Sequence, residues 1–387
     1  MLNIIKYLKK PLIYVYHTLI NLYWRMIIKH HNVVPINRLH FPYKKIKINY
    51  QLKSRKVNNS SLIEIYKIIN LYKPSKHYVF FSLRYKSFFS ENWIYDLATR
   101  IKRKRQNINI TPNPKKIELK KPVFFLTFTE VYSYFIFWNI FNILLLIKNK
   151  IPFVLAIHED QKKMPSFNID FINFLKKYLN LEIINFNDKD NLLIKSETIM
   201  INNYQKKGIY DLNKTNSDFP IFPREIINDL PHLIIKNKKL KKFFGKPRND
   251  IILISREDSR IMRNEKALLN KIPVIKRIVP EKLSIEEEIS FAYHAKVIIS
   301  PFGAAISNIF FARPECTLIR LKFNKKNNLD SKEDLFSDYT KFEMIAETKG
   351  MNYYIQNHGD FYGISNQKDS YFYADIKKID KLLKKII

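Results

Sequence analysis

The fold is decided by a stretch that opens with IILISREDSRIMRNE (251–265) and continues through KVIISPFGAAISN (296–308) to TLIRL (317–321). Each of its apolar runs is short, continuous and bounded by polar or turn residues, which is typical of strands buried on both faces of a parallel sheet. Helical patterns lie between the runs, and Ser284 with Glu287 three residues later forms a capping-box pair at the start of one of them. This alternation predicts a parallel, doubly wound sheet.

The same alternation continues on both sides of this stretch. The predicted order is strand 122–128, helix 131–147, strand 153–157, helix 168–178, strand 181–185, strand 251–255, a helix after Asn264, strand 274–279, helix 284–294, strand 296–300, helix 305–312, strand 317–321, helix 338–349, strand 351–355 and an amphipathic helix from Asp375. Residues 209–223 are rich in Asn and Pro and predict a loop, with the domain crossing after it. We therefore expect an α/β protein with two Rossmann-like domains, 121–235 and 236–387, and a central cleft, preceded by a basic extension over 1–120.

The chain is strongly basic, with 68 Lys and Arg against 35 Asp and Glu and a formal net charge of +33. These residues are spread over the whole chain, whereas a nucleic-acid-binding protein concentrates them on one element. We therefore expect no nucleic-acid partner and favour an anionic membrane surface or nucleotide phosphates. A basic scaffold for nucleic acid is the alternative, and it would show strongly salt-dependent binding. The one cysteine, Cys316, excludes disulfides within the chain and a Cys-rich metal site, and it fits a reducing, cytoplasmic location.

Two apolar runs raise the question of a membrane. The first, from about 12 to 28, is interrupted by His17, Asn21 and Arg25, and no small-residue cleavage site follows it. It fits either an amphipathic helix on the inner face of the cell membrane or an ordinary helix docked on the core. The second, 131–147, falls short of the roughly 20 apolar residues of a spanning helix. Because strands flank it on both sides, we expect a buried helix of a β-α-β unit.

Two strand ends carry the residues expected to bind a ligand. Ligands of open parallel sheets bind at the carboxyl ends of strands. The first end supplies Arg256 and Arg260, whose guanidinium groups offer the charge and paired hydrogen bonds that a diphosphate needs. The second supplies Gly303 and Ala304, which let the backbone approach a ligand closely. An arginine after a strand can also be a solvated charge in a loop. The glycine turn at the second strand end is what favours a ligand-binding site. The predicted binding set is Arg256, Arg260, Asn264, Glu265, Ser300, Gly303, Ala304, Ser307 and Asn308.

The ordered residues of this stretch resemble the C-terminal signature of glycosyltransferase family 61, which includes bacterial proteins of the capsular-polysaccharide type. That signature runs Ile-Ser-Arg, a later Arg, Asn-Glu, a serine-led helix, an Ala before an apolar strand, His-Gly-Ala-Gly and a Thr-Asn pair. The matching positions here are Ser255, Arg256, Arg260, Asn264, Glu265, Ser284, Ala295, Gly303, Ala304, Ser307 and Asn308. The resemblance covers roughly residues 251–321, and a weaker similarity begins near Tyr132.

The resemblance implies a GT-B-like architecture and an inverting hexosyl- or pentosyltransferase that uses a nucleotide sugar, with a UDP-sugar favoured. It implies neither a metal nor a cofactor. The expected acceptor is a glycan or a lipid-linked acceptor in capsular polysaccharide or lipopolysaccharide biosynthesis. Such an enzyme needs a base for the acceptor hydroxyl and positive charge for the leaving diphosphate.

The chain departs from the family pattern where a base is expected. Phe302 stands at the histidine of the glycine-rich turn and Phe135 at the histidine of an Asn-Tyr-Tyr-His-Trp stretch, while Asn139 and Arg320 replace carboxylates. Either the base has moved, or the chain binds its nucleotide without turnover. The candidate replacements follow predicted strands and are Glu130 and His158, with Glu159 and Asp160 beside the latter. Each of these also fits a solvated loop residue.

Overall fold

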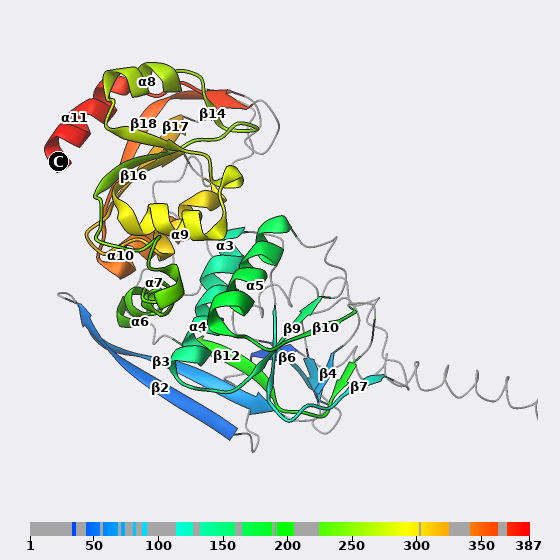
Figure 1. Cartoon of the computed structure of the whole chain (residues 1–387). Helices are drawn as coiled ribbons and strands as arrows, with labels where there is room; N and C mark the ends of the chain where they lie inside the picture. The colour runs from blue at the N-terminus through cyan, green and yellow to red at the C-terminus, as the bar shows by residue number, and fades with distance from the viewer. Residues whose placement is uncertain are drawn as a thin grey trace, which may run out of the picture.

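A computed structural model gives the structure of the chain (Figure 1). It describes residues 33–35, 44–54, 57–68, 71–73, 80–82, 87–90, 114–126, 132–158, 165–187, 190, 192–204, 224–301, 303–324, 341–362 and 370–387. Within these residues the protein is a mixed α/β molecule built on three sheets. No helix in this part of the chain combines the length and the apolar character needed to cross a membrane. The predicted amphipathic helix near 12–28 lies outside the described residues.

The C-terminal sheet contains the strands that the sequence predicts. Five of its strands run parallel, in the spatial order β15 (Ile275–Ile278), β13 (Asp250–Ile254), β16 (Ala295–Pro301), β17 (Thr317–Asn324) and β18 (Asn352–Tyr362). Beside β18, β19 (Tyr371–Phe372) runs antiparallel, and β14 (Ile261–Met262) pairs with β19. Relative to the chain, the parallel strands lie in the order second, first, third, fourth, fifth. The direction in which the sheet is built therefore changes between β13 and β16, and ligands of doubly wound sheets bind at such a point.

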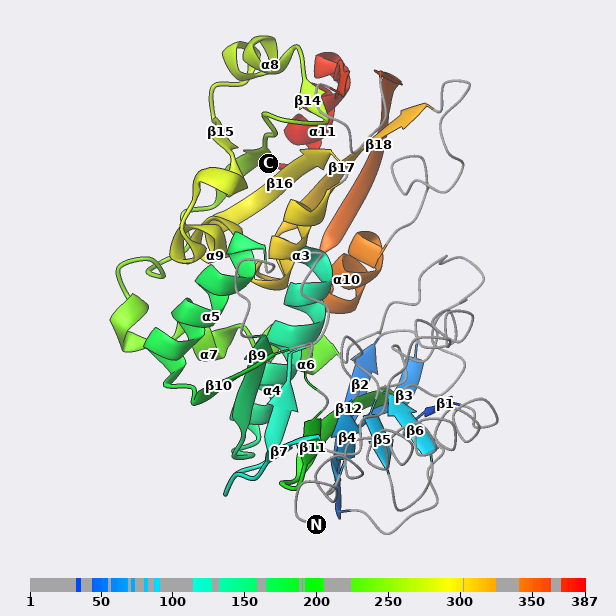
Figure 2. The same cartoon turned by 90° about the vertical axis from the view of Figure 1, so that its right-hand side faces the viewer.

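Both faces of this sheet are buried, which explains its continuous apolar runs. Alternate residues of one strand enter different cores: Ile252 and Ile254 of β13 join one cluster, and Ile251 and Leu253 join the other. The outer core is closed by α8 (Glu265–Lys271) and α11 (Ile376–Ile386). The inner core is closed by α9 (Ile285–His294) and α10 (Lys341–Lys349), which lie toward the N-terminal half of the molecule (Figures 1 and 2).

The predicted helix signals of this half are largely confirmed. The hydroxyl of Ser284 accepts a hydrogen bond from the backbone N–H of Glu287, whose carboxylate accepts one from the N–H of Ser284. The Asp375 carboxylate caps α11 by accepting a hydrogen bond from the backbone N–H of Lys378. The predicted helix at 305–312 is instead a 3-10 helix, η7 (Ala304–Phe310). A second 3-10 turn, η6 (Pro280–Lys282), precedes α9.

The second sheet belongs to the N-terminal half. Its spatial order is β10 (Ile183–Phe186), β9 (Val154–His158), β8 (Val123–Phe125), β12 (Thr198–Tyr204), β3 (Val57–Ile68) and β2 (Lys44–Ser54). The first four strands are parallel, and β3 pairs antiparallel with β12 and with β2. Hence the long hairpin at 44–68, for which the sequence predicted no defined plan, extends this sheet.

A third sheet of short strands lies beside it. Its order is β1 (Val33–Pro35), β6 (Ser87–Ser90), β5 (Phe80–Ser82), β4 (Leu71–Lys73), β11 (Leu192–Ile194) and β7 (Lys115–Ile117). The two halves of the chain are joined by the helices α6 (Arg224–Asp229) and α7 (His232–Ile235) and the 3-10 turn η5 (Lys238–Leu240).

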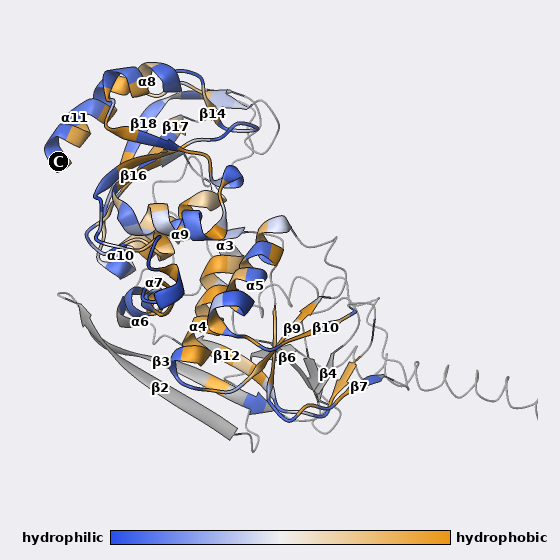
Figure 3. Ribbon diagram, viewed as in Figure 1, coloured by the Kyte–Doolittle hydropathy of each residue, from blue (hydrophilic) through white to orange (hydrophobic). Residues whose placement is uncertain are grey.

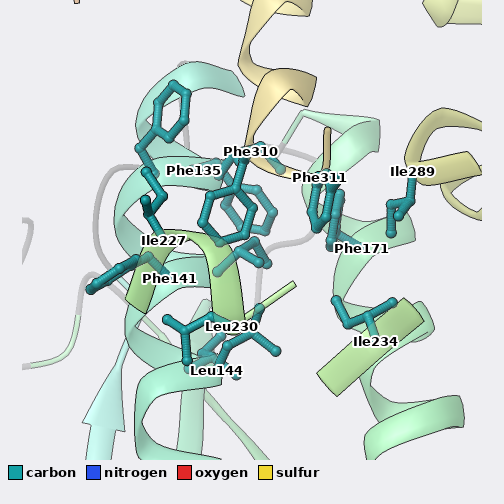
Figure 4. Packing of buried hydrophobic residues seen from close by; sticks show 14 of the residues in the cluster. Phe135, Phe141, Leu144, Phe171, Ile227, Leu230, Ile234, Ile289, Phe310 and Phe311 are labelled. Carbon is teal, nitrogen blue, oxygen red and sulfur yellow. The ribbon is translucent and has the colours of Figure 1, made fainter. Parts of the chain in front are cut away.

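The long apolar helix predicted at 131–147 is buried, as expected. It consists of α3 (Tyr132–Tyr134), a π-helical segment η3 (Phe135–Ile140) and α4 (Phe141–Lys148), and it connects β8 to β9. Its apolar surface stands out in Figure 3. Together with α5 (Ser166–Leu179), it packs against η7 of the C-terminal half, where the rings of Phe171 and Phe311 stack with centroids 6.1 Å apart (Figure 4). One continuous hydrophobic core therefore joins the two halves.

Candidate functional site

The carboxyl end of β13 delivers Arg256 to the point where the sheet changes direction. The hydroxyl of Ser255, the residue before it, donates a hydrogen bond to Glu265, and the Ser255 N–H continues the sheet by bonding to Ile278 O. The Arg256 side chain is 17% exposed, and its Nε lies 3.3 Å from Glu281 Oε1. Its Nη2 lies 3.4 Å from Asp258 Oδ1. A buried strand end therefore holds this guanidinium near the surface, where another anion can replace its two carboxylate partners.

The carboxyl end of β16 brings Gly303 against two arginines. A Cβ atom built on Gly303 would lie 3.1 Å from Nη1 of Arg260 and 3.4 Å from Nη1 of Arg256. Gly303 itself has extended backbone, with φ at 169°, so the absent side chain matters here for close approach and not for conformation. The two guanidinium groups and the glycine turn consequently lie together, at neighbouring strand ends.

Arg260 reaches this position through an unusual backbone. Its φ is 56°, in the left-handed region that costs a non-glycine residue roughly 1–2 kcal/mol. The Arg260 N–H donates to Ser370 Oγ at 2.9 Å, which anchors the turn to the segment before β19. Strained residues of this kind cluster at functional sites, because the surrounding structure must compensate for them.

A cavity of about 420 Å³ opens beside Arg256, between the two halves of the molecule. This volume falls in the range of roughly 300–1,000 Å³ that is common for small-molecule sites. Its lining comes from α3 and α5 on one side and from the β13 end, η6, α9 and η7 on the other: Tyr132, Ser166, Phe167, Asp170, Arg256, Pro280, Glu281, Leu283, Ile285, Glu288, Ala304 and Ala305. Both halves of the chain therefore contribute to one candidate ligand site.

A family comparison decides the class of protein. The model of the family described as Glycosyltransferase 61 matches residues 14–319. The chain belongs to glycosyltransferase family 61. A search of curated proteins finds no match. The family match is far longer than the stretch 251–321 that carries the sequence resemblance, and it runs from the N-terminal half of the chain into β17.

In this family 61 protein, two residues of the predicted binding set, Asn264 and Glu265, form hydrogen bonds to neighbouring elements of the fold. Asn264 clamps the backbone of Ala374, accepting from its N–H at 2.9 Å and donating to its carbonyl at 2.8 Å. Glu265 accepts from Ser255 Oγ and from Arg277 Nε. Both side chains thus tie the Arg-bearing loop to neighbouring elements, and neither lines the cavity.

The remaining members of the predicted set differ in their position. Ala304 lines the cavity directly. Ser300 is buried and donates to Pro301 O at 2.7 Å. The hydroxyl of Ser307 is buried, with no hydrogen-bond partner among the described residues. Asn308 is fully buried and bonds to Glu288 and Tyr132.

Glu288 is a cavity residue that the sequence reasoning missed. Its Oε2 accepts from the Tyr132 hydroxyl at 2.5 Å and from Asn308 Nδ2 at 3.0 Å. Burial raises the pKa of Glu288 to about 7, and these two hydrogen bonds oppose that rise. Burial and the adjacent Glu288 also raise the pKa of Tyr132 well above its usual value, so its hydroxyl remains a donor. The available signal was spacing: Glu288 lies on the buried face of α9 with Ile285 and Ala292.

Two family departures have structural explanations. Phe135 is buried in the aromatic core, with its ring centroid 5.8 Å from those of Phe167 and Phe171. Arg320 is fully buried in β17, where its Nε donates to Glu343 Oε1 of α10 at 2.5 Å. Glu130 and Phe302 lie outside the described residues, as do Glu159, Asp160 and the side chain of His158. The predictions of Glu130 and His158 as bases therefore stay predictions.

Proposed function

We propose that this chain is an inverting glycosyltransferase that moves a hexosyl or pentosyl group from a nucleotide sugar, with a UDP-sugar favoured, to a glycan or lipid-linked acceptor. The main support is that the guanidinium groups of Arg256 and Arg260 both lie beside Gly303. All three residues follow strands β13 and β16, between which the strand order of the sheet changes direction. Paired guanidinium groups bind a diphosphate through charge and directed hydrogen bonds. They also neutralise the charge that develops on the leaving diphosphate, a role that needs no metal ion.

The proposed division of labour follows the two Rossmann-like units. Residues 236–387 would bind the donor and 121–235 the acceptor, in a GT-B-like arrangement whose shared cavity lies between them. Arg256 pairs with Glu281 and Asp258, whose side chains are 50% and 69% exposed. Because both carboxylates can turn into solvent, a diphosphate can displace them at little cost.

The direct test is an activity assay over a panel of nucleotide sugars, with and without a chelator of divalent metals. We expect release of nucleoside diphosphate from one donor class, at a rate that the chelator leaves unchanged. Loss of release on chelation would contradict the metal-independent mechanism.

The second candidate function is a binding protein that holds the nucleotide without turnover. It is favoured by the phenylalanines at positions 135 and 302, where the family has histidines. The same assay separates the two functions. Donor binding without release of nucleotide or sugar, with every acceptor tested, would favour the binding protein over the enzyme.

We also propose a peripheral location on the inner face of the cell membrane, in the synthesis of capsular polysaccharide or lipopolysaccharide. The support is the formal net charge of +33, which favours an anionic surface. Co-sedimentation with anionic lipid vesicles at low salt, and its loss at high salt, is the expected result. Equal sedimentation with neutral vesicles would contradict an electrostatic attachment.

Gly303→Val is expected to weaken nucleoside diphosphate binding by about tenfold while leaving the fold intact. The added side chain would occupy the space held by the guanidinium tips of Arg256 and Arg260, so both must move. The extended φ of Gly303 accepts any residue, so little backbone strain is added. Isothermal titration and thermal unfolding measure the two quantities. Unchanged affinity would mean that the diphosphate binds elsewhere. Gly245→Val is the matched control, because Gly245 has open space around it.

A further inference from the structure

We propose that Glu288 is the base that takes the proton from the acceptor hydroxyl, and that Tyr132 and Asn308 position its carboxylate. The inference rests on the proposed function, because it assigns a role within that reaction. It starts from geometry: Glu288, Arg256 and Ala304, the residue after Gly303, line the same cavity. A donor held by the arginines would therefore present its sugar to the space that Glu288 faces.

The two oxygens of Glu288 have different surroundings. Both hydrogen bonds from the protein, from Tyr132 Oη and from Asn308 Nδ2, go to Oε2. Among the described residues, none hydrogen-bonds to Oε1. Oε2 thus fixes the orientation of the carboxylate, while Oε1 is left for a hydroxyl that enters the cavity. This is the arrangement that a base needs, since the group must be held firmly and still offer a lone pair to its substrate.

The network around Oε2 can hold the carboxyl in both protonation states. When Glu288 is ionised, Tyr132 and Asn308 donate to it. When Glu288 has taken the acceptor proton on Oε1, Oε2 can keep both of these hydrogen bonds and the new O–H faces the cavity. The proton acquired in the reaction therefore leaves no buried polar group unpaired within this triad.

The charges around Glu288 adjust its basicity to neutral pH. The pKa of Glu288 is raised to about 7, mainly by burial against α3 and η7, with a smaller contribution from the carboxylates of Glu281 on η6 and Asp170 on α5. Arg256 lines the same cavity from the end of β13. A base with a pKa near the working pH combines a useful fraction of the ionised form with strong proton affinity. Of the three carboxylates in the cavity lining, Asp170 and Glu281 are exposed and Glu288 alone is buried.

The proposed step balances as a single displacement. Glu288 accepts the proton of the acceptor hydroxyl, and the oxygen lone pair forms the new bond to C1 of the donor sugar from the face opposite the diphosphate. The bond between C1 and the phosphate oxygen breaks, and its electron pair leaves with the nucleoside diphosphate, whose added charge Arg256 and Arg260 neutralise. The products are the glycoside with inverted configuration, the nucleoside diphosphate and one proton on Glu288.

Glu288→Gln tests the assignment, because glutamine keeps the size of the side chain and removes its basicity. We expect kcat to fall by about 10²–10⁴-fold, the usual contribution of a general base, while the Kd for nucleoside diphosphate changes less than twofold. The wild-type rate should rise with pH through about 7, where Glu288 ionises, and level off above it. The variant should lack this rise. Glu287→Gln is the matched control, since Glu287 is exposed on the same helix and its capping role suits glutamine.

Tyr132→Phe gives an independent readout of the positioning role. It removes a hydrogen bond that lowers the pKa of Glu288, so the rise of rate with pH should move to higher pH. A lost packing contact alone would not shift that profile. An unmoved profile, or Glu288→Gln activity within threefold of wild type, would overturn the assignment and leave the proposed transferase intact. Absence of transfer by the wild-type protein with every donor would overturn both.

Discussion

Replacing Arg320 by methionine is expected to lower the free energy of unfolding by about 3–5 kcal/mol, because it removes the guanidinium that pairs with a buried carboxylate. Arg320 and Glu343 are both fully buried, and their contact joins the central strand β17 to α10. Glu343→Gln should cost a similar amount for the reciprocal reason. Urea unfolding followed by circular dichroism measures both losses.

Two further variants test whether the loss of stability comes from breaking a buried ion pair. The double variant Arg320→Met with Glu343→Leu should recover much of the lost stability, since apolar replacement of a buried ion pair is often neutral. Lys384→Met breaks the exposed pair with Asp380 on α11 and should cost less than about 0.5 kcal/mol. If either single variant at the buried pair were as mild as Lys384→Met, the buried-charge explanation would be wrong.

Arg256→Ala and Arg260→Ala are each expected to weaken nucleoside diphosphate binding by about 1.5–3 kcal/mol, or about tenfold or more in Kd. The reason is that each guanidinium would offer charged hydrogen bonds to the diphosphate from its place beside Gly303. Because the same bonds would strengthen as the leaving group gains charge, transfer should fall further than affinity. Steady-state kinetics and isothermal titration on the two single variants give these quantities.

Arg263, three residues after Arg260, supplies a matched control. The guanidinium of Arg263 lies over the ring of Tyr371, 4.9 Å from its centroid, and not against Gly303 as those of Arg256 and Arg260 do. Arg263→Ala removes the same charge from the same segment, so it should leave donor affinity within about twofold. Equal losses in all three variants would mean that the protein attracts the nucleotide through its overall charge and not through a built site.

The sheets could be predicted because their signals are local. The apolar runs at the β13, β16 and β17 positions need no knowledge of distant residues, and neither does the Ser284 capping box. The chirality and shortness of connections in such folds restrict the possible orders of the strands. The placement of the Arg256 and Gly303 turns at neighbouring strand ends was predictable for the same reason.

Other features depend on contacts between residues far apart in the chain. Tyr132 and Glu288 are 156 residues apart and meet only because α3 and α9 both pack on η7. Asn264 matched a binding pattern, yet its amide is taken by Ala374, 110 residues away. Likewise, the hairpin at 44–68 joins the N-terminal parallel strands through pairing with β12. Sequence spacing carries no information about such partners.

The central claim is that Arg256 and Arg260 hold a diphosphate at the Gly303 turn, and the most direct measurement is calorimetric titration with a series of ligands. Wild-type protein and the Arg256→Ala/Arg260→Ala variant would each be titrated with a nucleoside, its monophosphate and its diphosphate. The account predicts that wild-type affinity rises with each phosphate and that the variant binds all three alike. Equal affinity of the wild-type protein for all three ligands would contradict the account. So would a variant that keeps the full preference for the diphosphate.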